Sequence, residues 1–318
     1  MKLLIITVNY KSADQILLGI NEVVQQLRHI GDSEYWIIDN ASPDRSADSI
    51  SEAIIRENIN DIVKVVRSPI NGGFGAGNNI GIQKALKCKP PEYIHLLNPD
   101  AYLEPGCLIA FVSFMEIHSD VAICGGPLLD LKGDFQCGAF RFPSTYGEFE
   151  SLAKIAAVSY ILKAYRISID LANDPHQTDW VSGANIFFRG SIFSTIGDFD
   201  EDFFLYYEEV DLCYRARQLG VKVYMVPSAA VRHVGGTTTG KGSKGVRYPK
   251  TWFESRFRYF RKTMTPAQEF RLHAASILAI FIQILKSVLQ GRKPEPPHFL
   301  SDYIGHFFIR YTRKLWKI

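Results

Sequence analysis

Two kinds of hydrophobic pattern alternate along the first 130 residues. Short, nearly continuous apolar runs are typical of buried strands, and the segments between them repeat their apolar residues at helical spacing. The expected strands cover 3–8, 35–40, 61–68 and 121–129, with one more ending before Asp100, and the expected helices cover 16–30, 46–59, 76–87 and 108–118. This order predicts an α/β fold with a mostly parallel central sheet flanked by helices. Ligands of such sheets bind at the carboxyl ends of the strands.

The segment YIHLLNPDAYLEPG, residues 93–106, ends a buried strand on a carboxylate. One interpretation is a β-turn after a strand, where Asn98, Pro99 and Asp100 are all common residue types. The other is that Asp100 holds a divalent cation against a diphosphate, because hard cations bind carboxylate and phosphate oxygens. Only one carboxylate stands in this turn, so a metal site would need ligands from elsewhere in the chain.

A second candidate is the run FFLYYEEVDLCYRARQLG, which places Glu208, Glu209 and Asp211 at the start of a helical segment. Acids are favoured in a first turn by the helix dipole, and that accounts for one or two of them. The aromatic residues before them favour a pocket wall, where a carboxylate can have a raised pKa and act as a general base. His233 stands at a strand end before a Gly-Gly turn and is either a packed core histidine or a metal ligand.

The glycine-rich segment SPINGGFGAGNNIGI covers residues 68–82. A dinucleotide fingerprint requires G-x-G-x-x-G after the first strand, and neither the spacing nor the position fits, which argues against a Rossmann dehydrogenase. Two interpretations remain. The segment is a turn before a helix, or a loop whose backbone amides, with Asn78, approach a diphosphate.

Charge is distributed unevenly along the chain. Residues 241–318 hold 16 Lys/Arg against 4 Asp/Glu, whereas residues 1–240 hold 20 against 29. An acidic body with a basic tail predicts that the two parts meet different partners. The five cysteines show no CxxC pairing, which argues against a zinc module or a disulfide framework and for a reducing compartment.

Six motifs, in this order, resemble the family 2 glycosyltransferases and most of all their bacterial rhamnosyltransferase-like members. The motifs are TVNYKS, DNASPDRS, NGGFGAGNNIGI, LLNPDAYLEPG, WVSGANIFFRGSIFSTIGDFDEDFFLYYEEVDLCYRARQLG and VPSAAVRHVGG. The resemblance runs from about residue 3 to about residue 262, with a poor match at 131–179. It implies a GT-A fold, a nucleoside-diphosphate sugar donor, a divalent cation (Mg²⁺ or Mn²⁺) and inversion at the anomeric carbon.

The resemblance also implies roles for individual residues. Those assigned to the nucleotide are Thr7, Val8 and Asn9 around the base and ribose, Asp39 on the base, and Asn71, Gly72, Gly73 and Asn78. Asp100 matches the last acid of the metal-binding DxD motif, and His233 matches a histidine that completes the metal site in some members. Glu209 matches the usual general base, with Glu208 and Asp211 beside it.

Two departures from the family pattern bear on these roles. Asn98 replaces the first acid of DxD, which implies a more weakly held metal. Glu209 stands where the branch has Asp, so the base is either Glu208 or Glu209. In the scheme that results, a metal on Asp100 neutralises the leaving diphosphate while Glu209 takes the proton of the acceptor hydroxyl.

We therefore expect transfer of rhamnose or another hexose from a dTDP- or UDP-sugar to a glycan or polyprenyl-linked acceptor, in cell-surface polysaccharide synthesis. One alternative is a sugar-nucleotide pyrophosphorylase, which would need a glycine-rich basic signature near the first strand, whereas TVNYKS has no glycine. Another is a non-catalytic sugar-nucleotide or glycan-binding module, which gives no reason to gather three acids at 208–211.

The chain is expected to divide into a GT-A domain at 1–240 and a basic, amphipathic helical extension at 241–318, after a glycine- and threonine-rich loop. The extension combines basic residues from Arg256 to Arg271 with the apolar run ILAIFIQIL at 277–285. This run is too short to span a bilayer and fits a helix lying in the headgroup plane. Packing on the catalytic domain or in a homodimer is the alternative. We expect a cytoplasmic protein, held peripherally at an anionic inner-membrane surface, with no nucleic-acid partner.

Overall fold

The computed structural model describes residues 1–235 and 245–315, with side chains up to residue 309. The chain forms two compact units. Unit 1 comprises Met1–Phe140 with Ile169–Gly235, and unit 2 comprises Arg141–Ser168 with Gly236–Ile318. The expected boundary at residue 240 and the glycine- and threonine-rich loop fall outside the described residues, and the domain division at that point stays a prediction.

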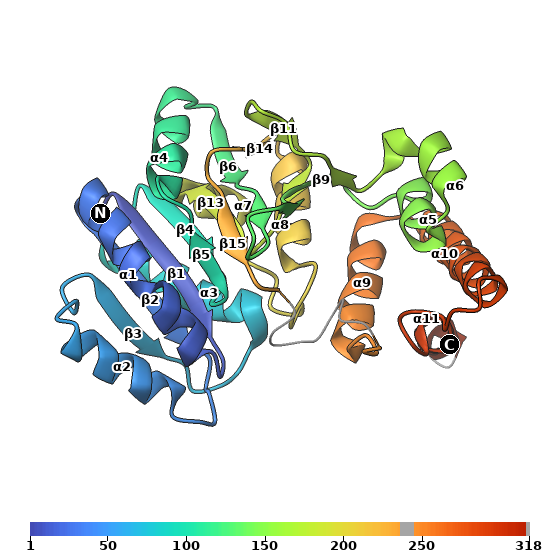
Figure 1. Cartoon of the computed structure of the whole chain (residues 1–318), viewed down its shortest axis with the longest axis horizontal. Helices are drawn as coiled ribbons and strands as arrows, with labels where there is room; N and C mark the ends of the chain where they lie inside the picture. The colour runs from blue at the N-terminus through green and yellow to red at the C-terminus, as the bar shows by residue number, and fades with distance from the viewer. Residues whose placement is uncertain (236–244, 316–318) are drawn as a thin grey trace. The chain divides into compact units, whose positions relative to one another are not determined.

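Unit 1 contains the main sheet and its covering helices (Figure 1). Its strands are β1 (Leu3–Asn9), β2 (Ser33–Asp39), β3 (Val63–Arg67), β4 (Tyr93–Leu97), β5 (Ala101–Leu103), β6 (Val121–Gly125), β7 (Leu128–Leu129), β8 (Phe135–Cys137), β9 (Ala139–Phe140), β11 (His176–Thr178), β12 (Trp180–Val181), β13 (Asn185–Arg189), β14 (Lys222–Met225) and β15 (Val231–His233). Its helices are α1 (Ala13–Ile30), α2 (Ser46–Arg56), α3 (Gly73–Cys88), α4 (Cys107–Ile117), the turn η2 (Gly190–Ile192), α7 (Phe193–Ile196) and α8 (Glu208–Gln218). The short strand β10 (Ser168–Ile169) contains the sequence boundary between the two units, after Ser168.

The main sheet has the strand order β11-β14-β6-β13-β4-β1-β2-β3. Neighbouring strands from β4 to β3 pair in parallel, as the sequence predicted. The strand β13 enters antiparallel between β4 and β6, with Asn185 opposite Leu97. Because β13 runs the other way, its beginning lies at the carboxyl end of β4. The loop before β13 therefore joins the ligand-binding edge of the sheet.

Alternate residues of β1 and β2 face opposite sides of the sheet. Leu3, Ile5 and Ile37 belong to the core that includes residues of α1, α2 and α4. On the other side, a Cβ atom added at Gly81 of α3 would lie 2.9 Å from Ile6 Cδ1 and 3.3 Å from Ile38 Cδ1. Helices thus cover both sides, and both strands are apolar almost throughout.

Glycines let α3 pack its backbone directly on β1. A Cβ at Gly77 would stand 2.7 Å from Val8 Cγ1, closer than real side chains approach. The sequence placed the start of this helix at residue 76, which is wrong by one turn, because α3 begins at Gly73. Its glycines serve close packing, which periodicity alone does not reveal.

A second, four-stranded sheet in the order β5-β15-β7-β8 lies beyond the end of β4. The pairing of β15 with β5 places His233 opposite Ala101, the residue after Asp100. His233 is the last residue of β15, at a strand end as the sequence predicted. This small sheet brings two segments together that are more than 130 residues apart in sequence.

Unit 2 is helical. Its elements are α5 (Thr145–Ala153), α6 (Ala156–Ile161), the turn η1 (Lys163–Tyr165), α9 (Lys250–Thr263), α10 (Pro266–Leu289) and α11 (Phe299–Leu315). The longest helix, α10, lies beside α5 (Figure 1). The apolar run 277–285, which by itself is too short to span a bilayer, is part of this longer helix. The whole helix is long and apolar enough to cross a membrane by length and composition, with a mean hydropathy of 1.9 over its most apolar window.

An ion pair joins α5 to α9 inside unit 2. Arg256 and Glu148 approach to 2.7 Å with side chains only 2% and 3% exposed. The Arg256 guanidinium also donates to Ser276 and Tyr303 and lies 4.8 Å from the ring centre of Phe260. A buried charge with this many partners is tolerated, whereas one left without its counter-ion is strongly unfavourable.

We predict that Glu148→Gln lowers the local unfolding free energy of unit 2 by about 3–5 kcal/mol, because it leaves the Arg256 charge buried without a carboxylate. Amide hydrogen exchange in α9 would measure it. The surface pair Lys250–Glu254, at 2.9 Å, supplies the control. Glu254→Gln should change the same quantity by less than about 1 kcal/mol. Adding Arg256→Met to Glu148→Gln should recover much of the loss, and equal stability of Glu148→Gln and the unaltered chain would contradict the account.

Candidate functional site

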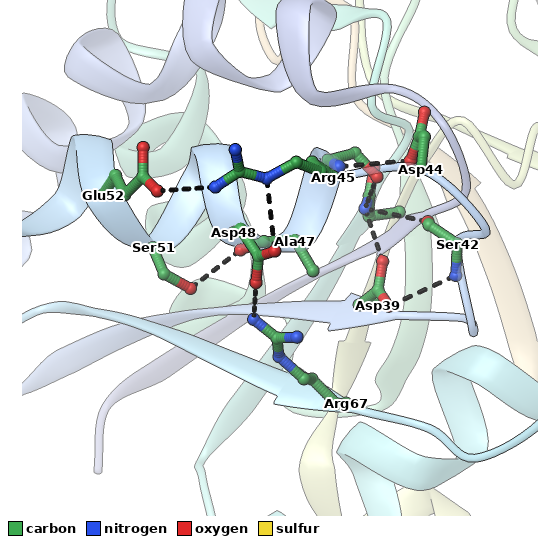
Figure 2. Close-up of polar contacts among 11 residues, drawn as sticks. Asp39, Ser42, Asp44, Arg45, Ala47, Asp48, Ser51, Glu52 and Arg67 are labelled. Atoms are coloured by element: carbon green, nitrogen blue, oxygen red, sulfur yellow. Dashed lines mark hydrogen bonds and ion pairs between the residues drawn. The ribbon is translucent and has the colours of Figure 1, made fainter.

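Asn9, at the end of β1, organises the first part of the carboxyl edge. Its side-chain amide donates to Asp39 at 2.7 Å, to Ser42 at 3.2 Å and to Ser46 at 3.1 Å, and its carbonyl oxygen accepts from the Ser12 amide. The Ser42 amide donates to the second oxygen of Asp39 at 3.3 Å. Figure 2 shows Asp39 beside Ser42, in the loop that joins β2 to α2. The Asp39 carboxylate is therefore fixed in orientation, as is required of a group that recognises a ligand.

Figure 2 also shows how the outer side of the same loop is held. Arg67, at the end of β3, donates to Asp48 of α2 at 2.6 Å, and this hydrogen bond lowers the pKa of the Asp48 carboxyl. Asp44 accepts from the Ser46 amide at 3.1 Å. Exposed pairs of this kind contribute little stability. They tie the ends of β2 and β3 to the start of α2.

A second polar group forms around Asn40, the residue after β2. Its side-chain amide donates to Asn71 and to the Gly73 carbonyl, both at 2.9 Å, and its oxygen accepts from the Gly72 amide at 3.4 Å. Asn71 in turn accepts from the Gly73 amide at 3.0 Å. The residues that the sequence assigned to the nucleotide at 71–73 thus lie together, at the N-terminus of α3.

Asp100, Asn98 and His233 meet in the turn after β4. His233 Nε2 lies 3.2 Å from an Asp100 oxygen and 3.4 Å from the Asn98 side-chain nitrogen. The Val234 amide donates to the Asp100 carbonyl at 3.1 Å, which joins the backbones of the two segments. Asp100 is buried, and His233 is partly exposed. The structure therefore brings together the residues that the sequence proposed as metal ligands.

The three acids of α8 have different surroundings. Asp211 is fully buried and pairs with Arg215 at 2.9 Å, and Arg215 also donates to the carbonyls of Ile196 and Asp198. Glu208 is buried, and Glu209 is partly exposed. Asp211 thus anchors the preceding loop to α8, which leaves the two glutamates at the tip of the helix as the candidates for direct chemistry.

Backbone strain precedes these glutamates. Tyr206 and Tyr207 have φ values of +72° and +68°, in the left-handed region that aromatic residues rarely adopt. Such residues cost about 1–3 kcal/mol each, and they persist where surrounding structure holds them and where a function needs the geometry. The strained pair turns the chain into α8 at Glu208.

Glu209 lies beside the loop that precedes β13. A Cβ at Gly183 would stand 3.5 Å from Glu209 Cβ and 3.5 Å from the ring of Phe74. The next residue, Ala184, accepts a hydrogen bond from the Asn98 amide at 3.1 Å. Two residues of the loop therefore connect Glu209 to the Asp100 turn. A Cβ at Gly75 of α3 would lie 3.8 Å from Glu208 Cβ, so Glu208 faces a different element.

Of the other residues expected to contact the nucleotide, Thr7 and Asn78 are buried. The Thr7 hydroxyl donates to the Leu97 carbonyl at 2.8 Å and accepts from Tyr35, whose pKa burial raises to about 12. Asn78 is buried and donates to the Phe74 carbonyl at 3.0 Å, while its buried oxygen has no hydrogen-bond partner. Val8 is partly exposed, next to α3. Contact of these residues with a nucleotide stays a prediction.

Sequence reasoning missed several residues that shape this edge. Asn79 donates to the Phe199 carbonyl and to Glu201, both at 3.0 Å, and accepts from the Phe199 amide. It thereby clamps the loop before α8 onto α3. Asn40 was the last residue of the expected strand 35–40, so an Asp-Asn pair at a strand end was an available signal. The left-handed tyrosines gave none, because nothing in their residue type predicts a positive φ.

Comparison with known proteins adds three relatives. The family model described as Glycosyl transferase family 2 matches residues 4–206. The rhamnosyltransferase WbbL of Escherichia coli is 25% identical over 51% of this chain and 60% of its own length. The low-salt glycan biosynthesis hexosyltransferase Agl10 of Haloferax volcanii is 26% identical over 69% and 62%. An N-acetylglucosaminyl-diphospho-decaprenol L-rhamnosyltransferase of Mycobacterium tuberculosis is 27% identical over 62% and 66%. The match thus spans less than two thirds of each relative.

Solved structures of glycosyltransferases share the fold of this chain. The mannosyltransferase PcManGT of Pyrobaculum calidifontis, in complex with GDP-Man and Mn²⁺, has a TM-score of 0.56 at 13% identity, over 99% of this chain and 81% of that one. Residues 1–349 of S. aureus TarS give 0.52 at 15% identity, over 96% and 81%. At these identities the likeness shows the fold alone, and it is the fold that the sequence resemblance implied.

We predict that Gly73→Ala disrupts the contact between α3 and the loop before α8. Gly73 has φ +88°, and its added Cβ would lie 1.9 Å from the Phe204 carbonyl oxygen, which accepts from the Phe74 amide. Gly133→Ala is the control, because Gly133 has φ +93° with no atom within 4 Å of the added Cβ. Both variants should lose about 1 kcal/mol from backbone strain. Only Gly73→Ala should speed hydrogen exchange at the Phe74 amide, and equal exchange in the two would contradict this contact.

Proposed function

The chain belongs to glycosyl transferase family 2, and we propose that it transfers a hexose from a nucleoside-diphosphate sugar to a glycan or lipid-linked acceptor. The observation that carries the proposal is that one loop at the carboxyl edge of the sheet lies beside both groups: Gly183 is next to Glu209, and Ala184 is hydrogen-bonded to the turn that holds Asp100. In this arrangement Glu209 can accept the proton of an attacking hydroxyl, and Asp100 can bind a cation that stabilises the departing diphosphate.

The relatives support the chemical class of donor and acceptor. Two of them are named rhamnosyltransferases and a third a hexosyltransferase, which supports rhamnose or another hexose as the transferred sugar. The mycobacterial relative is named for a diphospho-decaprenol acceptor, which supports a polyprenyl-linked acceptor here. We retain dTDP and UDP as the proposed nucleotides. The Asn9–Asp39 pair and the Asn40–Asn71–Gly73 group are the polar groups proposed to bind them.

The residues around Asp100 fit a divalent cation. An Asp100 carboxylate oxygen lies 3.2 Å from the imidazole nitrogen Nε2 of His233, and a carboxylate oxygen with an imidazole nitrogen suits Mn²⁺. Among residues 1–235 and 245–315, no three His, Cys, Asp or Glu side chains cluster as a self-sufficient metal site. Phosphate oxygens of the donor would then complete the coordination, as is common for Mg²⁺. When bound, the cation supplies positive charge to the departing diphosphate.

Glu209 is the residue proposed to act on the acceptor. It is partly exposed at the tip of α8, beside Gly183, whereas Glu208 is buried against α3. A carboxylate in this position can accept the proton of an acceptor hydroxyl as that oxygen attacks the anomeric carbon. Attack on the face opposite to the diphosphate inverts the anomeric configuration. The Arg215–Asp211 pair and the Asn79 clamp hold the loop that precedes α8, the helix that carries Glu209.

We predict that Asp100→Asn abolishes metal-dependent donor turnover and leaves the fold intact, because Asn keeps the size of this buried side chain in the turn after β4. Release of free nucleoside diphosphate, titrated with Mn²⁺, is the measurement, and thermal unfolding is the fold control. Wild-type rates with an unchanged metal requirement in Asp100→Asn would refute the metal role.

We predict that Glu209→Gln leaves donor affinity nearly unchanged and lowers turnover by about 10²–10⁴-fold, since it removes a base while keeping its shape. Glu208→Gln is the matched control one residue away. A larger loss of turnover in Glu208→Gln than in Glu209→Gln would show that the base is the neighbouring glutamate.

A further inference from the structure

The helix α10 has an inverted distribution of polar residues. Its buried positions include Glu269, His273 and Ser276, which lie within the interior of unit 2. The His273 ring makes a 2.8 Å hydrogen bond with the Tyr303 hydroxyl, and Ser276 accepts from Arg256 at 3.3 Å. In an ordinary surface helix the polar residues face water and the apolar ones face the core. Here the inner face carries polar groups.

The outer face of α10 is apolar. We call it the α10 stripe, and its exposed large members are Phe270 (51%), Leu278 (54%), Phe281 (55%), Leu285 (50%) and Val288 (60%). Successive members are three, four or eight residues apart, so they form one line along the helix on the side opposite to Leu272, Ser276 and Ala279. Scattered exposed apolar residues need no explanation, but a continuous row over five turns marks a surface that is covered in use.

The charge of unit 2 identifies what covers the stripe. Its sequence holds 20 Lys/Arg against six Asp/Glu, whereas unit 1 holds 16 against 27. Three of the six acids, Glu148, Glu150 and Glu269, are buried. Exposed basic residues stand at both ends of the stripe: Arg271 at its start, and Arg292 with Lys293 just beyond its end. A surface that offers apolar side chains flanked by cations complements the headgroups and acyl chains of anionic lipid.

We propose that the α10 stripe binds an anionic bilayer, with α10 lying in the headgroup plane and its polar face kept inside unit 2. A second copy of the chain would bring two strongly basic surfaces together, which electrostatic repulsion opposes. If α10 instead crossed the bilayer with lipid on all sides, Glu269 and His273 would be exposed to hydrocarbon, which is unfavourable for polar groups. Arg256, which the sequence placed among the lipid-facing cations, is buried and paired with Glu148, so its part in that interpretation is wrong.

The structure also shows which variants test this surface. Removing residues 252–318 would take away Arg256 and strand the buried Glu148 charge, so truncation would test folding and binding together. Substitution of Leu278, Phe281 and Leu285 by Gln removes the centre of the stripe without touching a buried residue. The control is the triple Gln substitution of Leu18, Ile55 and Leu219 in unit 1, which are 78%, 74% and 57% exposed.

The experiment is sedimentation of the full chain with phosphatidylglycerol/phosphatidylcholine vesicles, without donor or acceptor. The unaltered chain and the unit 1 control should bind, less strongly as salt rises, and should bind pure phosphatidylcholine weakly. The stripe variant should bind anionic vesicles about tenfold less or worse, because three apolar side chains no longer enter the bilayer. Arg292→Gln with Lys293→Gln should weaken binding and flatten its salt dependence.

Phe281→Trp provides a second readout that does not depend on a disruptive change. Its added fluorescence should shift to the blue on anionic vesicles and be quenched by brominated lipid, while Ile55→Trp should show neither effect. Equal vesicle binding by the stripe variant and the control, or an unquenched Phe281→Trp, would overturn the proposal. A loss of dimer in the stripe variant by light scattering, with vesicle binding intact, would instead identify a second copy as the occupant. Neither result depends on the proposed glycosyl transfer.

Discussion

The antiparallel insertion of β13 beside β4 is the constraint on which the candidate site depends. The register that sets Asn185 opposite Leu97 places Gly183 and Ala184 at the carboxyl end of β4. Ala184 then accepts from the Asn98 amide, and Gly183 leaves room for Glu209. Because side chains alternate along strands, a slip of one residue would turn every β13 side chain to the other face. The distance between the proposed base and the Asp100 turn is thus fixed by strand pairing.

The two units divide the chemistry of the chain. Unit 1 is acidic, and its polar groups converge at one edge of the sheet, around Asn9, Asn40 and Asp100. Unit 2 is basic, and its best-organised polar groups are buried, around Arg256 and His273. The first arrangement suits recognition of a ligand, and the second suits an apolar outer face. A single net charge of +3 conceals this division.

Four of the five expected strands match β1 to β4, because buried strands are short apolar runs and polar residues mark where each one stops. Asp100 was found in this way, whereas Asp39 came from the family resemblance and the start of α8 from its run of acids. Glycosyl transferase family 2 was identified from the order of the motifs. The expected strand 121–129 is wrong, because it is two strands, β6 and β7, that belong to different sheets. Contacts between distant segments could not be predicted. The pairing of β15 with β5, the Asn79 clamp and the ion pair of Arg256 with Glu148 each depend on packing that one-dimensional periodicity does not contain.

We propose that unit 1 moves a sugar from a nucleoside diphosphate to an acceptor. The most direct test is the time course of free nucleoside diphosphate from a panel of dTDP- and UDP-sugars, with Mn²⁺ and a polyprenyl-linked acceptor. The account predicts steady release from at least one donor, with the transferred sugar in the inverted anomeric configuration. Binding of donors without turnover of any of them, or formation of pyrophosphate from a nucleoside triphosphate and a sugar phosphate, would contradict it.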